Sequence, residues 1–134
     1  MRQINDNIIP IQTAATVTTA NPINFDTKEY DSHNATTTGS AWKYVAPVSG
    51  LYSLQGVIAS TTGTGTTYTI YKNSAAYKGL QTTLSSYNTL SIAASLRLNA
   101  GDFIDIRPSG TVIVSGGALS SNPISILEIT RTGN

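Results

Sequence analysis

The stretch from Trp42 to Ala59 reads WKYVAPVSGLYSLQGVIA and predicts two β-strands joined by a short turn. Most of the residues at every second position on both sides of the turn are large and apolar or aromatic, which is the period of a strand with one buried face. Pro47 lacks a backbone donor and ends the first strand, and Gly50 can adopt the positive φ that a turn requires. The second face of the second strand is not purely polar, so we expect another layer or another subunit to cover it. The residues that we assign to the core or to a trimer contact are Trp42, Tyr44, Tyr52 and Leu54.

The rest of the chain continues as short apolar segments separated by turn residues. The alternation is clearest between Leu90 and Leu98, and no helical periodicity occurs anywhere. About ten antiparallel strands without helices predict an all-β fold, a jelly-roll β-sandwich. The predicted strands span residues 11–18, 23–30, 42–46, 51–59, 68–73, 75–84, 90–98, 103–107, 111–115 and 124–130.

The length of 134 residues fits a single domain with one core. We assign residues 21–134 to this jelly-roll domain. Residues 1–20 form either an N-terminal arm or the first strand, and the arm would be a segment for attachment to a larger assembly.

The composition excludes several classes of protein. Charged residues make up 11% of the chain, against about 25% in an average domain. The net charge is +1 and no basic stripe occurs, so we expect no nucleic acid partner. Cysteine is absent, which excludes disulfides and thiolate catalysis. No apolar run reaches the ~18 residues of a membrane span, and the first residues have no apolar signal region, so we expect neither membrane insertion nor a cleaved signal peptide.

Five segments, taken in order over roughly residues 20–131, resemble the globular head of complement C-one-q, a branch of the tumour necrosis factor superfold. They are FD…YD…TG at 25–39, Y-x-x-P-x-x-G-x-Y-x-L at 44–54, IYKN at 70–73, L-x-L-x-A-G-D-F-I at 96–104 and SILEI at 125–129. The family often has an aromatic residue where Leu54 stands, and an F-x-G motif where this chain has SNPI at 121–124. The resemblance implies a homotrimer whose strands pack around a three-fold axis and whose exposed loops bind proteins or sugars.

One oxygen-rich segment is a candidate metal site. Calcium binds six to eight oxygen ligands, and Asp26, Glu29 and Asp31 are the candidate ligands here. Their spacing does not match an EF-hand, and a solvated acidic loop is the alternative. We expect no other cofactor. His33 is the single histidine and no G-x-S-x-G motif occurs, so we expect no enzyme activity.

Tyrosines near strand ends are candidates for an exposed ligand-binding rim, because tyrosine combines contact area with a polar tip. These candidates are Tyr71, Tyr77 and Tyr87. Arg97 lies on the polar face of its strand, where it could form an ion pair between subunits. Asp102 follows Gly101 in a turn, where we expect its carboxylate to accept hydrogen bonds from nearby backbone amides.

A surface dominated by Thr, Ser, Asn and Gly resembles the domains that phages and other viruses carry on fibres, tails and capsids. We therefore expect a non-enzymatic trimeric virion surface protein, such as a phage fibre, tail or receptor-binding tip, that adheres to a host surface protein or glycan. One alternative is a capsid decoration or head-fibre protein that binds other virion proteins through its N-terminal arm. Another is a cellular lectin-like or cytokine-like binding module.

Overall fold

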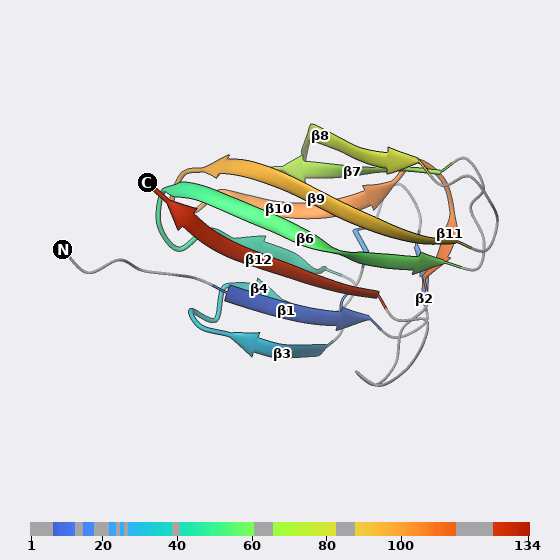
Figure 1. The fold of residues 1–134 in the computed structure, drawn as a ribbon, viewed down its shortest axis with the longest axis horizontal. Helices are drawn as coiled ribbons and strands as arrows, with labels where there is room; N and C mark the ends of the chain where they lie inside the picture. Colours follow the sequence, from blue (N-terminus) through green and yellow to red (C-terminus); the bar gives the residue numbers. More distant parts are fainter. Residues whose placement is uncertain are drawn as a thin grey trace.

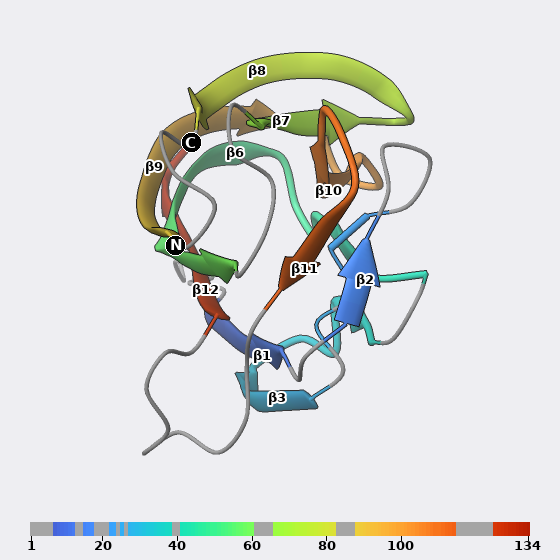
Figure 2. The same ribbon diagram turned by 90° about the vertical axis from the view of Figure 1, so that its right-hand side faces the viewer.

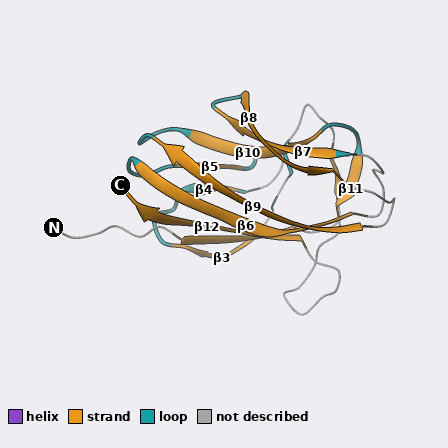
Figure 3. Cartoon of the chain, turned by 45° about the horizontal axis from the view of Figure 1, so that its top comes forward, coloured by secondary structure: helices purple, strands orange, loops and turns teal. Residues whose placement is uncertain are grey.

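The computed structural model describes residues 7–12, 15–17, 22–23, 25, 27–38, 41–60, 66–82, 88–114 and 125–134. These ranges contain twelve strands and no helix (Figure 3). None of them contains a helix that could cross a membrane. The strands are β1 (Asn7–Gln12), β2 (Ala15–Val17), β3 (Thr27–Asp31), β4 (Thr36–Thr37), β5 (Lys43–Val45), β6 (Gly50–Ser60), β7 (Thr67–Lys72), β8 (Ala75–Thr82), β9 (Asn88–Leu98), β10 (Phe103–Pro108), β11 (Val112–Val114) and β12 (Ser125–Gly133).

The strands form two antiparallel sheets that pack face to face (Figure 1). The larger sheet has the order β2-β11-β6-β12-β1-β3, and β9 pairs with β6 along the whole length of both strands. The smaller sheet has the order β4-β5-β10-β7-β8. Most neighbours in space are distant in sequence, as in a jelly roll and unlike a simple meander. The fold is therefore the all-β jelly-roll β-sandwich that the sequence predicts.

The start of the chain differs in detail from the prediction. A single strand over 11–18 is wrong, because the structure has β1 and β2 there instead. Both strands pair within the larger sheet, β1 with β12 and β3 and β2 with β11, so they belong to the sandwich. The segment between the predicted strands 23–30 and 42–46 also contains the two-residue strand β4, which pairs with β5.

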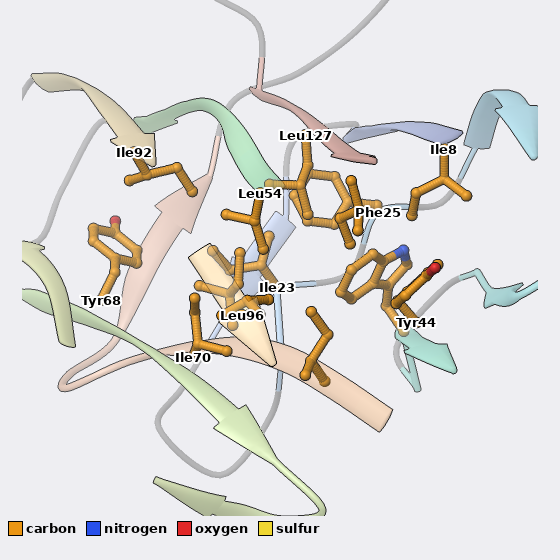
Figure 4. Close-up of a cluster of buried hydrophobic side chains, with 14 of the residues drawn as sticks. Ile8, Ile23, Phe25, Tyr44, Leu54, Tyr68, Ile70, Ile92, Leu96 and Leu127 are labelled. Carbon is orange, nitrogen blue, oxygen red and sulfur yellow. The ribbon is translucent and has the colours of Figure 1, made fainter. Parts of the chain in front are cut away.

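Strand β6 shows how alternation builds the core. Tyr52, Leu54 and Ile58 are at most 1% exposed and point between the sheets. Leu51 and Gln55 point the other way and are exposed. Apolar side chains from both sheets meet in one cluster, which Figure 4 shows around Leu54, Leu96 and Ile70. Burial of this apolar area is the main stabilising term of such a sandwich.

Aromatic pairs occupy one part of this core. The rings of Phe25 and Trp42 meet edge to face with centroids 5.0 Å apart, and those of Tyr44 and Tyr52 do so at 5.9 Å. This geometry is favourable for aromatic pairs. Trp42, Tyr44, Tyr52 and Leu54 are all buried inside one protomer, so none of them offers a surface for a contact with a second copy.

The turn between β5 and β6 is fastened to the last strand. Gly50 has a φ of 157°, and a Cβ atom there would lie 2.3 Å from the carbonyl oxygen of Gly133. The hydroxyl of Tyr52 donates a hydrogen bond of 2.6 Å to the carbonyl oxygen of Val48. Glycine is therefore required at position 50 by the close approach of β12.

Figure 2 looks at the sandwich from one end. Strands β6, β9 and β12 form one wall of the molecule, and β7 and β8 lie across its top. The outward side of this wall is a broad sheet face.

Candidate functional site

The wall formed by β9, β6 and β12 turns one regular set of side chains outward. In β12 the buried residues alternate with half-buried ones, and in β9 they alternate with exposed ones. Strand register places the outward residues in rows, with Val57 between Ser91 and Ile126 and Gln55 between Ala93 and Glu128. We call this set the outer face: it comprises Leu51, Ser53, Gln55 and Val57 of β6, Ser91, Ala93, Ser95 and Arg97 of β9, and Ile126, Glu128 and Thr130 of β12.

The outer face is hollowed at its centre. A shallow groove of about 450 Å³ runs across the three strands, and Gly56 contributes to its floor. Most of its lining is apolar or small, and the groove is open to solvent. Its lining residues are Gln55, Gly56, Val57, Ser91, Ile92, Ala93, Ile126, Leu127 and Glu128. A face of small, mostly uncharged side chains allows another protein surface to approach closely.

The outer face carries two charges of opposite sign, Arg97 and Glu128. Glu128 accepts hydrogen bonds from Gln55 Nε2 at 3.2 Å and from the Thr130 hydroxyl at 3.4 Å. Arg97 lies opposite Leu51, and Glu128 lies opposite Gln55 on the other side of β6. At ordinary strand spacing their Cα atoms are about 16 Å apart, too far for an ion pair within one protomer. Each charge is thus available to a second molecule.

The smaller sheet carries a different cluster on its outward side. Arg107 forms two hydrogen bonds to the carboxylate of Asp105, from Nε at 2.8 Å and from Nη2 at 3.0 Å. The guanidinium carbon lies 4.4 Å from the ring centroid of Tyr71. The hydrogen bonds that Arg107 donates to the Asp105 carboxylate raise the pKa of Arg107 above its usual value. Asp105 is buried although it points outward, so this cluster covers the middle of the sheet face.

Tyr71 and Tyr77, two of the three tyrosines that the sequence groups as one rim, do not lie together. Tyr71 lies opposite Ala76 in the β7–β8 hairpin, and Ile70 lies opposite Lys78, so Tyr77 is the extra residue of a β-bulge. Tyr77 is 37% exposed and contacts Lys72 and Lys78, whereas Tyr71 contacts Arg107. Tyr87 lies outside the described residues. The structure thus provides two separate tyrosine surfaces.

Asp31 closes a turn at the end of β3. Its carboxylate accepts hydrogen bonds from the backbone amides of Ala35 at 2.9 Å and Thr36 at 3.0 Å, and from Lys28 Nζ at 3.0 Å. Burial raises the pKa of Asp31, but the hydrogen bond from Ala35 and those from Lys28 and Thr36 outweigh burial and hold it below 3.8.

The other two candidate calcium ligands, Asp26 and the side chain of Glu29, lie outside the described part of the structure, so the calcium site stays a prediction. Among the side chains that are described, no group of three or more His, Cys, Asp or Glu residues could hold a metal ion. His33 is exposed and its Nδ1 lies 2.9 Å from the hydroxyl of the adjacent Ser32.

Asp102 ties together the loops at one end of the sandwich. Its carboxylate accepts hydrogen bonds from Asn73 Nδ2 at 2.9 Å and from the Asn99 amide at 2.8 Å, and Lys72 Nζ lies 3.4 Å away. The side chain of Asn73 in turn accepts a hydrogen bond from the Phe103 amide. The hydrogen bonds from Asn73 and Asn99 lower the pKa of Asp102. The sequence predicts the local contact with Asn99, but gives no signal for Asn73, which comes from another hairpin.

The overall architecture matches domains of known structure. The chain superposes on Eiger TNF from S. frugiperda with a TM-score of 0.69 and 15% identity, covering 98% of this chain and 93% of that one. It superposes on the globular domain of zebrafish complement 1qA protein with a TM-score of 0.67 and 14% identity, covering 98% and 100%. Murine APRIL at pH 5.0 gives a TM-score of 0.69 at 12% identity, covering 96% and 100%.

The chain has the tumour necrosis factor and complement-head fold. The resemblance drawn from the sequence motifs is therefore confirmed at the level of fold. No protein-family model matches the chain, and no curated protein matches it. At identities of 12–15%, the likeness to these three structures extends to the fold alone.

Proposed function

We propose that this chain is a non-enzymatic binding module that assembles as a homotrimer through its outer face. The feature that carries the proposal is the small, mostly uncharged surface of β9, β6 and β12 with its open apolar groove. A sheet face of this kind is stabilised when it is covered. A three-fold contact between identical subunits covers it on each copy and closes into a ring, so that no fibre grows.

The two opposite charges of the outer face favour a second copy as the occupant. Arg97 and Glu128 are too far apart to pair within one protomer, and both are offered by the same surface. In a ring of identical subunits, Arg97 of one copy faces Glu128 of the next. Complementary charges of this kind set the register of an interface and disfavour other partners.

The proposed setting is the surface of a virion, where the trimer binds a host surface protein or glycan. Its support is the composition, which is rich in Ser, Thr, Asn and Gly and has 11% charged residues. Exposed loops on a rigid sandwich are where binding residues commonly lie. The attachment function would be carried by surfaces that the trimer contact leaves open.

The assembly is tested by native mass. One chain has a mass of 14.1 kDa, so a trimer has a mass of about 42 kDa (3 × 14.1), measured by light scattering behind a sizing column. We expect Ala93→Arg, in the groove of the outer face, to give a species of one-chain mass. The matched control is Ala76→Arg, also at an exposed alanine but on the smaller sheet opposite Tyr71, which should remain a trimer. A wild-type protein of one-chain mass, or equal behaviour of both variants, contradicts the proposal.

The attachment function is tested with particles or with the isolated trimer on host cells. Deletion of residues 1–20 would remove β1 and β2 and unfold part of the larger sheet. A deletion that tests an N-terminal arm must therefore keep Asn7 and all later residues. We expect such a truncated protein to bind host cells as the full chain does. Loss of particle association in the truncated protein, together with no binding of host cells by the full chain, would instead favour the capsid decoration function.

A further inference from the structure

Two lysines of the β7–β8 hairpin donate hydrogen bonds to backbone carbonyls at one edge of β9. Among the described strands β9 pairs with β6 alone, and its other edge faces β8. Lys72 Nζ donates a hydrogen bond of 3.2 Å to the carbonyl oxygen of Arg97, and Lys78 Nζ donates one to the carbonyl oxygen of Ser95. Two of the chain's four lysines are thus anchored at alternate residues of one strand edge.

Both ammonium groups also share one aromatic ring. Lys72 Nζ lies 5.0 Å and Lys78 Nζ 5.5 Å from the ring centroid of Tyr77, within the range of cation–π attraction. Tyr77 reaches this position because it is the bulged residue of β8. Bulges commonly redirect a side chain at an edge strand or beside a functional site.

Carboxylates balance the positive charge of Lys72 and Lys78 only in part. Asp102 lies 3.4 Å from Lys72 Nζ, and no carboxylate among the described residues forms an ion pair with Lys78. Each ammonium group has three donors, and one of them is used on a β9 carbonyl. A second donor of Lys72 faces Asp102, which leaves two donors on Lys78 and one on Lys72 beside an exposed aromatic edge.

We propose that Lys72, Lys78 and Tyr77 form a binding site for a sulfate or carboxylate group of an acidic glycan. The proposal rests on the proposed adhesion function and names its ligand class. The site lies within one protomer, at the edge of β9 and not in the groove across β6, β9 and β12, so it does not require assembly. Hydrogen bonds from ammonium groups to an anion are among the strong ones, and the tyrosine offers its exposed edge to the sugar ring.

The surroundings favour a saccharide over an acidic protein. The residues next to Tyr77 in the hairpin are small or polar, namely Ser74, Ala75, Ala76 and Gly79, and all are exposed. Tyr77 is the single exposed large apolar side chain of this hairpin in the described structure. Protein partners are typically held by several buried aromatic or apolar anchors, which this surface lacks.

The test uses the full chain and measures affinity for heparin, for polyglutamate and for neutral dextran by titration calorimetry at fixed salt. We expect heparin to bind and dextran not to bind. Lys78→Gln should weaken heparin binding about tenfold, the usual size for loss of a charged hydrogen bond. Tyr77→Ala should also weaken it, because the two ammonium groups lose the ring that holds them together. The matched control is Lys43→Gln, since Lys43 also lies 5.0 Å from an aromatic ring, that of Phe103, but as a single ammonium group.

Each outcome of these titrations supports or overturns one specific part of the proposal. Equal loss in Lys43→Gln and Lys78→Gln would mean attraction by net charge alone and would overturn the site. Polyglutamate binding as tight as heparin binding would assign the surface to an acidic protein and overturn the glycan. A wild-type trimer that does not bind heparin overturns the site but leaves the trimer proposal intact. A monomer that binds heparin through Lys78 overturns the trimer and keeps the site. Circular dichroism of each variant confirms that the sandwich is folded.

Discussion

Replacement of Gly56 by alanine should be among the most damaging single-methyl changes in this chain. Gly56 lies in the middle of β6, paired on one side with Ile92 and on the other with Leu127. A Cβ atom at this position would lie 2.3 Å from the carbonyl oxygen of Ile126 and 2.9 Å from the Cα atom of Leu127. Both contacts are with backbone, so no side-chain rotation relieves them. The pairing of β6 with β12 would have to shift.

The size of the effect follows from two opposing terms. Overpacking of a tightly packed site costs about 1–3 kcal/mol, and contacts this short with backbone place Gly56→Ala at the upper end. Loss of glycine freedom in the unfolded chain returns about 0.4–1 kcal/mol. We therefore expect a net destabilisation of about 2 kcal/mol, which lowers the melting temperature of a domain of this size by roughly 6–12 °C.

Gly79 provides the matched control, because it is also a strand glycine but a Cβ atom there would meet no atom within 4 Å. Gly79→Ala should leave the stability unchanged or raise it by up to about 1 kcal/mol. Urea unfolding at one fixed protein concentration, followed by the fluorescence of the single buried Trp42, measures both variants. Equal unfolding midpoints for Gly56→Ala and Gly79→Ala would refute the argument from close approach.

Three further outcomes are expected. Arg97→Glu or Glu128→Arg alone should weaken assembly by about tenfold or more, and the double exchange should restore much of the affinity. Sedimentation at graded protein concentration measures this. A double variant that assembles no better than either single variant rules out the ion pair. Leu54→Ala, at a fully buried position, should cost about 3–5 kcal/mol in a urea titration, and a cost below about 1 kcal/mol would place Leu54 outside the packed core. Asp31 and Asp102 have pKa values lowered in the folded state, so they stabilise the fold above their ordinary value of 3.8 and lose this effect as the pH falls through the folded pKa. Stability measured between pH 2 and 7 should therefore fall on the acid side, and less steeply when Asp31 and Asp102 are both changed to asparagine; identical pH curves would exclude their role.

Most strands could be predicted because their alternation is local information. The pattern around Leu54 and the one from Leu90 to Leu98 each specify a buried face without reference to the rest of the chain. The start of β1 could not be predicted in this way. Pro10 stands inside that strand, where a proline argues against pairing, and it is accommodated because the register with β3 shifts between Ile8 and Pro10. The strand β4 is two residues long in a polar segment and leaves no pattern to detect.

The candidate site was less accessible from sequence than the fold. The outer face could be anticipated from the second, partly apolar side of β6, but Glu128 becomes its neighbour only through the pairing of β6 with β12. Tyr71 and Tyr77 are separated because Tyr71 pairs with Ala76, and the residue after Ala76 turns to the other face of the hairpin. The register that sets this pairing cannot be read from the spacing of the tyrosines.

The carboxylate of Asp102 has a consequence for how the end of this sandwich can change. Segments 46–50, 73–74 and 99–103 meet there, joined by the contacts of Asp102 with Asn73 and Asn99 and by the backbone hydrogen bond from Ala46 to Asp102. These three segments cannot change independently, because all of them depend on hydrogen bonds to Asp102. A longer or grafted loop at 73–74 would also remove the hydrogen bonds that Asn73 makes to the turn before β10. Sequence changes at this end of the sandwich must therefore be made in all three segments together. New binding specificity is more readily introduced by single surface substitutions along the hairpin than by insertion at its tip.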